Sequence, residues 1–279
     1  SMNLCDSFIK CYKGSITFKT IHHERNRGLS SARTAGLLHA AGDYVFFLDS
    51  DDELHATSIA LLVDKAKEYP DIEMIQGCTT SIPNKPRYDI NRFIKHDGCI
   101  TDNNWIRDNY YKYNPSLLPV NAWNKLLKTR FLLDHHLFFK EGIIYEDVHW
   151  MWFLVKHLTS MAFVFQPTYI HYVTPNSIIT SRTKEKQALN MGVILQELIY
   201  HVDSLSYADQ LKKILILNRN AEVSKYYREN YGNFIFNVMK KLWAYKEYKS
   251  ISYLLLWVLC LPMKDSSKLY RKTFESIKY

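Results

Sequence analysis

The pattern of hydrophobic and polar positions in the first third of the chain is typical of an α/β protein. Residues 16–22 alternate β-branched and aromatic residues with polar ones, which predicts a strand. Residues 29–41 place apolar side chains at helical spacing and are followed by a glycine, which predicts a helix. Residues 43–49 are apolar on both faces, as expected for a strand in the middle of a parallel sheet. The predicted order is strand, helix, strand.

The same alternation continues toward the middle of the chain. Residues 56–69 form an amphipathic helical pattern that ends before a proline, and residues 72–78 predict another strand. Prolines interrupt residues 79–120, which we assign to loops with a short helix near NNWIRDNYY. From about residue 183 the pattern is helical to the end. The sequence therefore predicts an α/β domain with right-handed crossovers over residues 1–180 and a C-terminal helical region over residues 181–279.

Composition narrows the class of protein. A chain of 279 residues that is 47% hydrophobic can bury a sizeable core, so one or two folded domains are expected. Five cysteines are an odd number without C-x-x-C spacing, which indicates neither a disulfide framework nor a zinc site. The first residues lack the pattern of a secretory signal. We therefore expect a cytoplasmic protein.

The excess positive charge lies at the C-terminal end. Residues 181–279 contain 17 Lys and Arg against 9 Asp and Glu, whereas residues 1–180 contain 19 of each kind. A basic region suits an anionic membrane surface or a nucleic acid, although a solvated helical surface is equally common. Without any recognised nucleic-acid motif, no nucleic-acid partner is predicted. The apolar run over residues 251–263 is too short to span a bilayer, so it would lie on the inner membrane face or pack in a core.

Three carboxylates follow the predicted strand of residues 43–49. Asp49, Asp51 and Asp52 lie at a strand end, where open parallel sheets bind their ligands. One alternative is that they cap the helix expected near residue 56. Capping needs only one acid, however, and crowded like charges favour a hard divalent cation with oxygen ligands, Mg²⁺ or Mn²⁺.

Residues 26–54 carry a more specific resemblance. Their Asn-x-Gly loop, Ser-x-Ala-Arg, Ala-x-Gly-Asp and Asp-x-Asp-Asp elements resemble those of family 2 glycosyltransferases, enzymes with the GT-A fold that use nucleotide-activated sugars. The resemblance implies an α/β GT-A fold with a mostly parallel sheet. It also implies that Asp49 and Asp51 hold the metal, that Asp52 supports the donor sugar or the metal shell, and that Asn26 and Arg33 line the donor side.

Two later segments extend the resemblance. Residues 121–132 resemble the Trp-Asn-Lys-Leu segment near the family's acceptor side, which implies substrate contacts for Trp123 and Lys125. Residues 139–154 resemble the family's Glu-Asp helix start, which implies that Asp147 is the catalytic base and that Glu146 contacts substrate. A carboxylate at a helix N-terminus suits proton removal from an acceptor hydroxyl group. Without this context, the two acids would be ordinary first-turn charges of a helix.

A histidine downstream is a further candidate. His171 lies in a segment that resembles the one after the Glu-Asp motif, and it could complete the metal or phosphate shell. The alternative for His171 is a hydrogen-bonded structural role, and for Trp123 it is core packing.

The sequence also departs from the family pattern. The family's usual first two strands, the second of which ends in an Asp-Asp-x-Ser motif, are absent, and Thr34 replaces a common asparagine. We expect an N-terminally truncated GT-A sheet whose apolar edge favours association with a partner chain or a second copy.

The function predicted from these segments is sugar transfer with inversion. The donor would be a nucleotide-diphosphate sugar, with UDP-sugars the first candidates. The acceptor would be a saccharide or a lipid-linked hydroxyl group in cell-surface polysaccharide synthesis. The alternative is a truncated, inactive glycosyltransferase-like protein that acts through binding.

Overall fold

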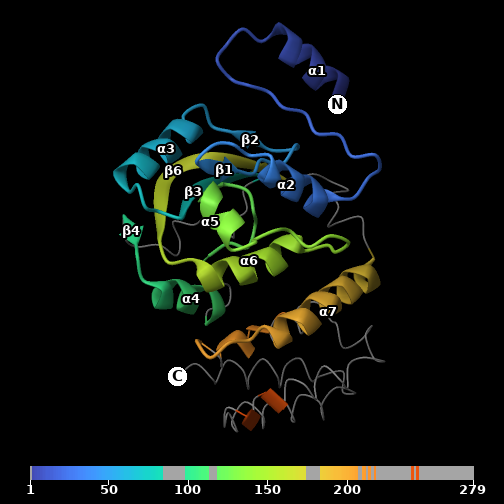
Figure 1. Cartoon of the computed structure of the whole chain (residues 1–279), viewed down its shortest axis with the longest axis vertical. Helices are drawn as coiled ribbons and strands as arrows, with labels where there is room; N and C mark the ends of the chain where they lie inside the picture. Colours follow the sequence, from blue (N-terminus) through green and yellow to red (C-terminus); the bar gives the residue numbers. More distant parts are fainter. Residues whose placement is uncertain are drawn as a thin grey trace.

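The computed structural model describes residues 2–83, 98–112, 118–173 and 183–206, with short pieces at 209–211, 213–214, 217, 240–241 and 243–244. In chain order the elements are α1 (Met2–Cys11), α2 (Leu29–Leu38), β1 (Tyr44–Phe46), β2 (Glu53–Leu54), α3 (Ser58–Glu68), β3 (Met74–Ile82), β4 (Cys99–Ile100), α4 (Asn103–Tyr111), β5 (Lys125–Lys128), α5 (Thr129–Asp134), α6 (Glu146–His157), β6 (Met161–Tyr172) and α7 (Lys184–Tyr200) (Figure 1). The helices predicted from residues 29–41, 56–69 and NNWIRDNYY correspond to α2, α3 and α4.

The sheet is mixed, which corrects the expectation of a mostly parallel one. Its strand order is β1-β5-β3-β6-β2, with β4 pairing on β6. Strands β1 and β3 each pair antiparallel with β5, while β3 and β6 pair in parallel. Strands β1, β3 and β6 therefore run in one direction with β5 inserted against them. The pattern of apolar residues within one strand does not predict that β5 lies between β1 and β3.

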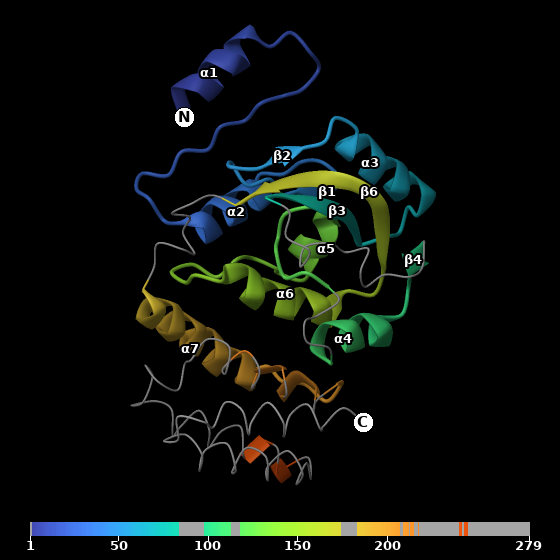
Figure 2. The ribbon, with the colours of Figure 1, turned by 180° about the vertical axis from the view of Figure 1, so that it is seen from behind.

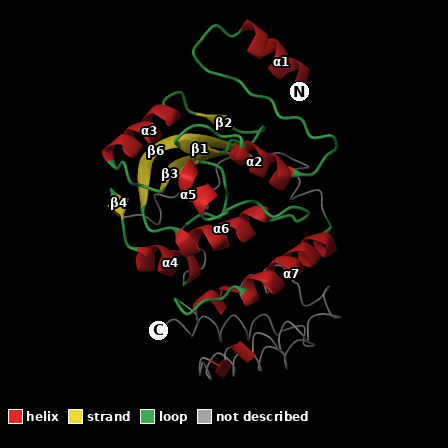
Figure 3. Ribbon diagram, in the orientation of Figure 1, coloured by secondary structure: helices red, strands yellow, loops and turns green. Residues whose placement is uncertain are grey.

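Two strand predictions need correction. The strand predicted over residues 43–49 is β1, which is shorter, half-buried and at one end of the described sheet rather than at its middle. Residues 16–22 form an exposed extended segment between α1 and α2, because no described strand lies beside them to complete a ladder (Figure 3). Phe18 from this segment packs instead on the rings of Phe8 and Tyr12 beside α1.

Helices cover both faces of the sheet. Helix α3 lies on one face, and α4 and α6 lie on the other with α7 beyond α6, as both views of the ribbon show (Figures 1 and 2). Successive side chains of β3 face opposite sides of the sheet. Ile75 packs with Leu62 of α3, whereas Met74 packs with the cluster around α6.

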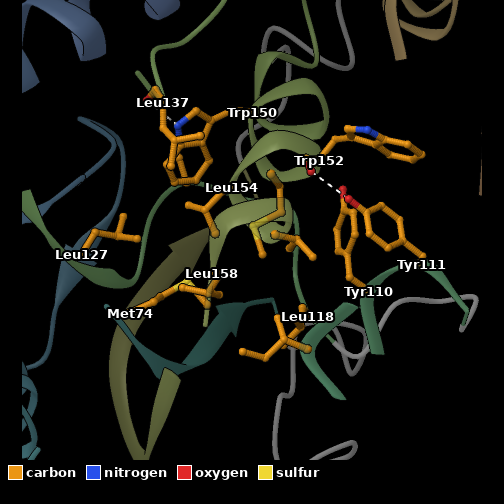
Figure 4. Packing of buried hydrophobic residues seen from close by; sticks show 14 of the residues in the cluster. Met74, Tyr110, Tyr111, Leu118, Leu127, Leu137, Trp150, Trp152, Leu154 and Leu158 are labelled. Carbon is orange, nitrogen blue, oxygen red and sulfur yellow. Dashed lines mark hydrogen bonds between the residues drawn. The ribbon is translucent and has the colours of Figure 1, made fainter. Parts of the chain in front are cut away.

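The larger core surrounds α6. Trp150, Trp152, Tyr110 and Tyr111 are at most 1% exposed, and the Tyr111 hydroxyl donates to the Trp152 carbonyl oxygen at 2.9 Å (Figure 4). Apolar residues of α7 join this cluster: Met191, Ile194, Leu195, Leu198 and Ile199. Helix α7, which opens the region expected to be helical from residue 183, thus packs into the same core as the sheet.

Some sequence predictions lie outside the described residues. These include the apolar run over residues 251–263 and most of the helical pattern beyond residue 206. Within the described ranges, none of the helices has the length and hydropathy that crossing a membrane requires.

Helix α6 is the element that presents the predicted base. It is apolar on nearly all sides, with Val148, Leu154 and Val155 buried, as is typical of a helix inside a core. Tyr145, in left-handed conformation at φ 66°, turns the chain into its first residue. Glu146 and Asp147 occupy the first turn, where the helix dipole stabilises negative charge. The burial of α6 therefore fixes two carboxylates at its N-terminus.

Candidate active site

The three carboxylates after β1 lie on a short loop, residues 49–52, which we name the carboxylate loop. The Asp52 backbone N–H donates to the Asp49 carbonyl oxygen at 3.2 Å and closes a turn. Strand β2 separates this loop from α3, whose N-cap is Thr57. In the described structure the acids therefore do not cap α3, which removes that alternative.

Asp52 is held by β6. The Tyr169 hydroxyl donates to Asp52 Oδ2 at 2.8 Å, and the Tyr172 backbone N–H donates to Oδ1 at 2.9 Å. The Tyr169 oxygen also accepts from the Asp49 backbone N–H at 3.2 Å. Burial raises the pKa of Asp52 although these two hydrogen bonds act in the opposite direction. Both carboxylate oxygens of Asp52 thus contact the protein itself.

Arg33 joins the two acidic motifs. This buried residue of α2 donates to Asp49 Oδ1 at 2.6 Å and to Glu146 Oε1 at 2.9 Å. Its guanidinium also lies 5.4 Å from the centre of the Phe139 ring. The carboxylate loop and the N-terminus of α6, almost one hundred residues apart in the chain, therefore meet at one cation.

Asp147 has the electrostatic properties of a general base. Burial, together with the charge of Glu146, raises its pKa to about 7, against the opposing influence of the Val148 N–H, Arg33 and Lys125. The Val148 backbone N–H donates to Asp147 Oδ1 at 2.8 Å. A carboxylate that titrates near neutral pH can accept a proton from a hydroxyl group more readily than an ordinary aspartate.

Besides Arg33, two fully buried groups interact electrostatically with Asp147, namely Lys125 and Tyr110. Lys125 is fully buried and its ammonium group donates to the Asn121 carbonyl oxygen. Burial lowers the pKa of Lys125 to about 7, and the charge of Asp147 acts in the opposite direction. Burial, and then Asp147, raises the pKa of Tyr110. The sequence singled out Lys125 through its motif but missed Tyr110, which carries no signal beyond aromatic core spacing.

Trp123 and His171 lie in an aromatic stack beside the carboxylate loop. The Trp123 ring is stacked on Tyr169 at 4.6 Å between centroids and on His171 at 5.3 Å. Trp123 is only 8% exposed, so its indole is packed against protein rings. This geometry corresponds to the core-packing alternative for Trp123.

Asn26 makes a local hydrogen bond in the loop before α2. Its side-chain oxygen accepts from the Gly28 backbone N–H at 2.9 Å and closes the turn before α2. Next to it, Arg27 donates to Glu141 at 2.7 Å, and the Ser31 hydroxyl donates to the same carboxylate at 3.1 Å. Glu141 therefore connects the loop before α6 to α2 through two hydrogen bonds. No sequence motif indicated this residue.

Eight of the ten predicted site residues form two groups, which the carboxylate loop joins. Arg33, Asp49, Glu146, Asp147 and Lys125 make an ionic group. Asp52 and Trp123 contact Tyr169, and His171 stacks on Trp123. Among the described residues, no group of three or more His, Cys, Asp or Glu side chains is arranged to hold a metal ion. Mg²⁺ is usually held by one or two carboxylates, with phosphates and waters completing the shell. The carboxylate oxygens of Asp49 and Asp51 have the chemistry that Mg²⁺ requires, and Asp49 Oδ1 also accepts from Arg33 at 2.6 Å.

Comparison with known proteins gives consistent results. Residues 3–125 match the family model "Glycosyl transferase family 2". The chain is 25% identical to a cholesterol galactosyltransferase of Borreliella burgdorferi over 187 residues, which cover 64% of this chain and 52% of that protein. It is 44% identical to the poly(ribitol-phosphate) beta-N-acetylglucosaminyltransferase TarP of Staphylococcus aureus over 61 residues, 22% of this chain and 18% of that protein. The chain therefore spans at most about half the length of these curated relatives.

A solved structure extends the likeness to the whole fold. The crystal structure of S. aureus TarS residues 1–349 in complex with UDP-GlcNAc superposes with a TM-score of 0.65 at 17% identity. The match covers 99% of this chain and 78% of that one. The α/β GT-A fold predicted from the sequence is confirmed by this likeness.

Proposed function

We infer, from the match of residues 3–125 to the glycosyl transferase family 2 model, that this chain transfers a sugar from a nucleotide-diphosphate donor to a hydroxyl group of its acceptor. The observation that carries the proposal is the Arg33 bridge between Asp49 and Glu146. It brings the carboxylate loop, proposed as the donor-binding end, beside the proposed base Asp147. The two halves of a transfer site, donor binding and proton removal, then lie side by side.

The proposed reaction is a single displacement with inversion. Asp147 accepts the proton of the acceptor hydroxyl group as that oxygen forms a bond to the anomeric carbon of the sugar. The bond from the anomeric carbon to the phosphate oxygen breaks, and the nucleoside diphosphate leaves with the electron pair. A base with a pKa of about 7 is largely ionised just above neutral pH and still accepts a proton readily, which supports this assignment.

The carboxylate loop is the proposed donor end of the site. Asp49 and Asp51 would hold Mn²⁺ or Mg²⁺, which offsets the negative charge of the diphosphate when bound. Arg33 donates to Asp49 at 2.6 Å, so it orients that carboxylate and limits the repulsion between neighbouring acids. His171 and Asp52 are proposed to complete the surroundings of the diphosphate, and Asn26 to border the donor.

Donor and acceptor classes follow from chemistry and from relatives. TarS was crystallised with UDP-GlcNAc, which supports a UDP-sugar as the proposed donor of this chain. The relatives are named for a sterol acceptor and for a polyol-phosphate polymer, so a saccharide or lipid-linked hydroxyl acceptor is proposed here.

The basic charge of residues 181–279 supports a peripheral position on an anionic membrane surface. We propose the same division, at residue 180, between a catalytic domain and a basic helical region.

Calorimetric titration of the full chain with UDP and with GDP, each with Mn²⁺, tests the donor proposal. We expect one diphosphate to bind, and Asp51→Ala to weaken that binding. Asp147→Asn should retain diphosphate binding yet lose sugar transfer, measured as release of UDP in the presence of acceptor. Binding of neither diphosphate would refute the active-enzyme proposal and favour a binding protein, and full activity of Asp147→Asn would refute the base assignment.

A further inference from the structure

Tyr169 is the contact point between β6 and the carboxylate loop. Its single hydroxyl group serves two partners on that loop, donating to Asp52 Oδ2 at 2.8 Å and accepting from the Asp49 backbone N–H at 3.2 Å. The residue is fully buried, so its ring cannot present a face to a substrate. One oxygen atom therefore connects the first and last residues of the carboxylate loop, 120 and 117 positions away in the chain.

The ring of Tyr169 packs against two other aromatic rings. Trp123 stacks on it with an interplanar angle of 14°, and Phe46 of β1 lies against it with a centroid separation of 6.4 Å. Because these contacts already order the ring, its hydroxyl group loses little further side-chain entropy when it forms its hydrogen bonds. The aromatic contacts thus aim the hydroxyl at the carboxylate loop.

Asn124 fixes the strand that carries Tyr169. It is fully buried in left-handed conformation, and its amide nitrogen donates to the carbonyl oxygens of Gly77 and Cys78 in β3. Its amide oxygen accepts from the Thr168 hydroxyl at 2.7 Å. These bonds lie where the pairing of β3 with β6 shifts register, next to Gly77 and Cys78. Asn124 thereby fills an irregularity in the sheet directly before Tyr169.

Gly77 shows how closely this region is packed. A Cβ atom at Gly77 would lie 1.9 Å from Thr168 Oγ1 and 2.7 Å from Asn124 Oδ1. Only a residue without a side chain allows Asn124 and Thr168 to meet there. The path from β3 through Asn124 and Thr168 to Tyr169 is therefore rigid, which suits a support for a binding loop.

We propose that Tyr169 is a positioning residue whose hydroxyl group holds the carboxylate loop in the geometry that binds the diphosphate of the donor. It does so without touching the substrate, and the Trp123-Asn124 pair keeps Tyr169 in place. Residues 123–125 then have two roles. Trp123 and Asn124 support β6 and so act on the donor side, and Lys125 is placed near Asp147. The link to donor binding rests on the proposed function, whereas the support of the loop can be measured in the protein alone.

The test is Tyr169→Phe, which removes the hydroxyl group and leaves the ring to stack on Trp123. Hydrogen exchange of the peptide covering residues 47–54 reports on the loop without any ligand, because the Asp49 N–H loses its acceptor. We expect faster exchange in that peptide. Affinity for UDP with Mn²⁺, measured by calorimetry, should fall about tenfold or more, as for loss of a hydrogen bond to a charged group.

Tyr111→Phe is the matched control. Tyr111 is equally buried, and its hydroxyl donates to the Trp152 carbonyl oxygen at 2.9 Å in the core between α4 and α6. This variant loses the same chemical group and should lower the melting temperature, yet leave exchange of residues 47–54 and UDP affinity as in the parent. An equal rise in loop exchange in both variants would overturn the proposal, because it would reflect general destabilisation.

A double variant sharpens the result. Asp52→Ala removes the carboxylate partner, so adding Tyr169→Phe to it should raise loop exchange by less than the two single effects together. Unchanged exchange in Tyr169→Phe, or fully additive effects, would overturn the positioning role. Faster exchange with unchanged UDP affinity would also overturn it. If the parent bound no diphosphate, the proposed function would fail, and the exchange data alone would decide whether Tyr169 holds the loop.

Discussion

Replacing Arg33 with methionine removes the cation shared by the two acidic motifs while keeping an unbranched side chain in the buried space. Asp49 and Glu146 would then face the same space without the guanidinium between them. Their side chains are 26% and 14% exposed, and Arg33 is 8% exposed. Water therefore reaches these two ion pairs only in part. When the guanidinium is removed, hydration replaces only part of the stabilisation that Arg33 gave the two carboxylates.

The expected loss of stability follows from this burial. Breaking a buried ion pair by removing one partner costs about 3–5 kcal/mol, whereas exposed pairs are worth about 0–1 kcal/mol. Two partly buried pairs that share one arginine fall between these limits. We therefore expect Arg33→Met to lower the free energy of unfolding by about 2–4 kcal/mol. In a domain of this size the melting temperature should fall by about 4 °C or more.

Urea denaturation followed by circular dichroism measures this loss, with Lys67→Met as the control. Lys67 pairs with Asp64 at 3.1 Å on the surface of α3, where both side chains are at least 70% exposed. That variant should change the free energy of unfolding by less than about 1 kcal/mol. If the two variants lost similarly small amounts, the Arg33 bridge would not be a buried, stabilising connection. If Arg33→Met also kept full affinity for UDP, the bridge would have no part in shaping the donor end.

Three further predictions concern the base, the packing and the metal. Transfer should rise with pH through about 7 as Asp147 ionises, and Asp147→Asn should abolish it. Because the pKa of Asp147 is raised in the folded state, stability should fall as pH rises from about 4 to about 7, and melting curves of Asp147→Asn should lack that part of the fall. Gly77→Ala should cost about 1–3 kcal/mol in urea denaturation, because its Cβ would lie 1.9 Å from Thr168 Oγ1; parent-like stability would contradict the packing. Chelation with EDTA should weaken UDP binding in the parent and change it little in Asp51→Ala, as calorimetry can check.

Local patterns in the sequence were sufficient to predict most helices of the fold. The helical spacing of residues 29–41 and 56–69 corresponds to α2 and α3, and the first-turn acids of residues 146 and 147 do begin α6. Helical hydrogen bonds join residues four apart, so the information needed is contained within one segment. The motifs were readable for the same reason, since each is a short run with fixed spacing.

Strand pairing was less predictable. The apolar run over residues 43–49 reads as a central parallel strand, yet β1 lies at one end of the described sheet and pairs antiparallel with β5. The alternation in residues 16–22 is equally typical of a strand, but no described strand lies beside it. Each described strand here pairs with a strand distant in the chain, and its own residues do not specify that neighbour.

The sequence by itself determined the acidic motifs and the match of residues 3–125 to the glycosyl transferase family 2 model. Only the tertiary structure decided how the acids differ. Asp49 pairs with Arg33, Asp52 is bonded to β6 through Tyr169, and loss of hydration raises the pKa of Asp147 to about 7. The chemical state of a carboxylate depends on burial and on the charges beside it, and here those neighbours come from segments up to about 120 residues away.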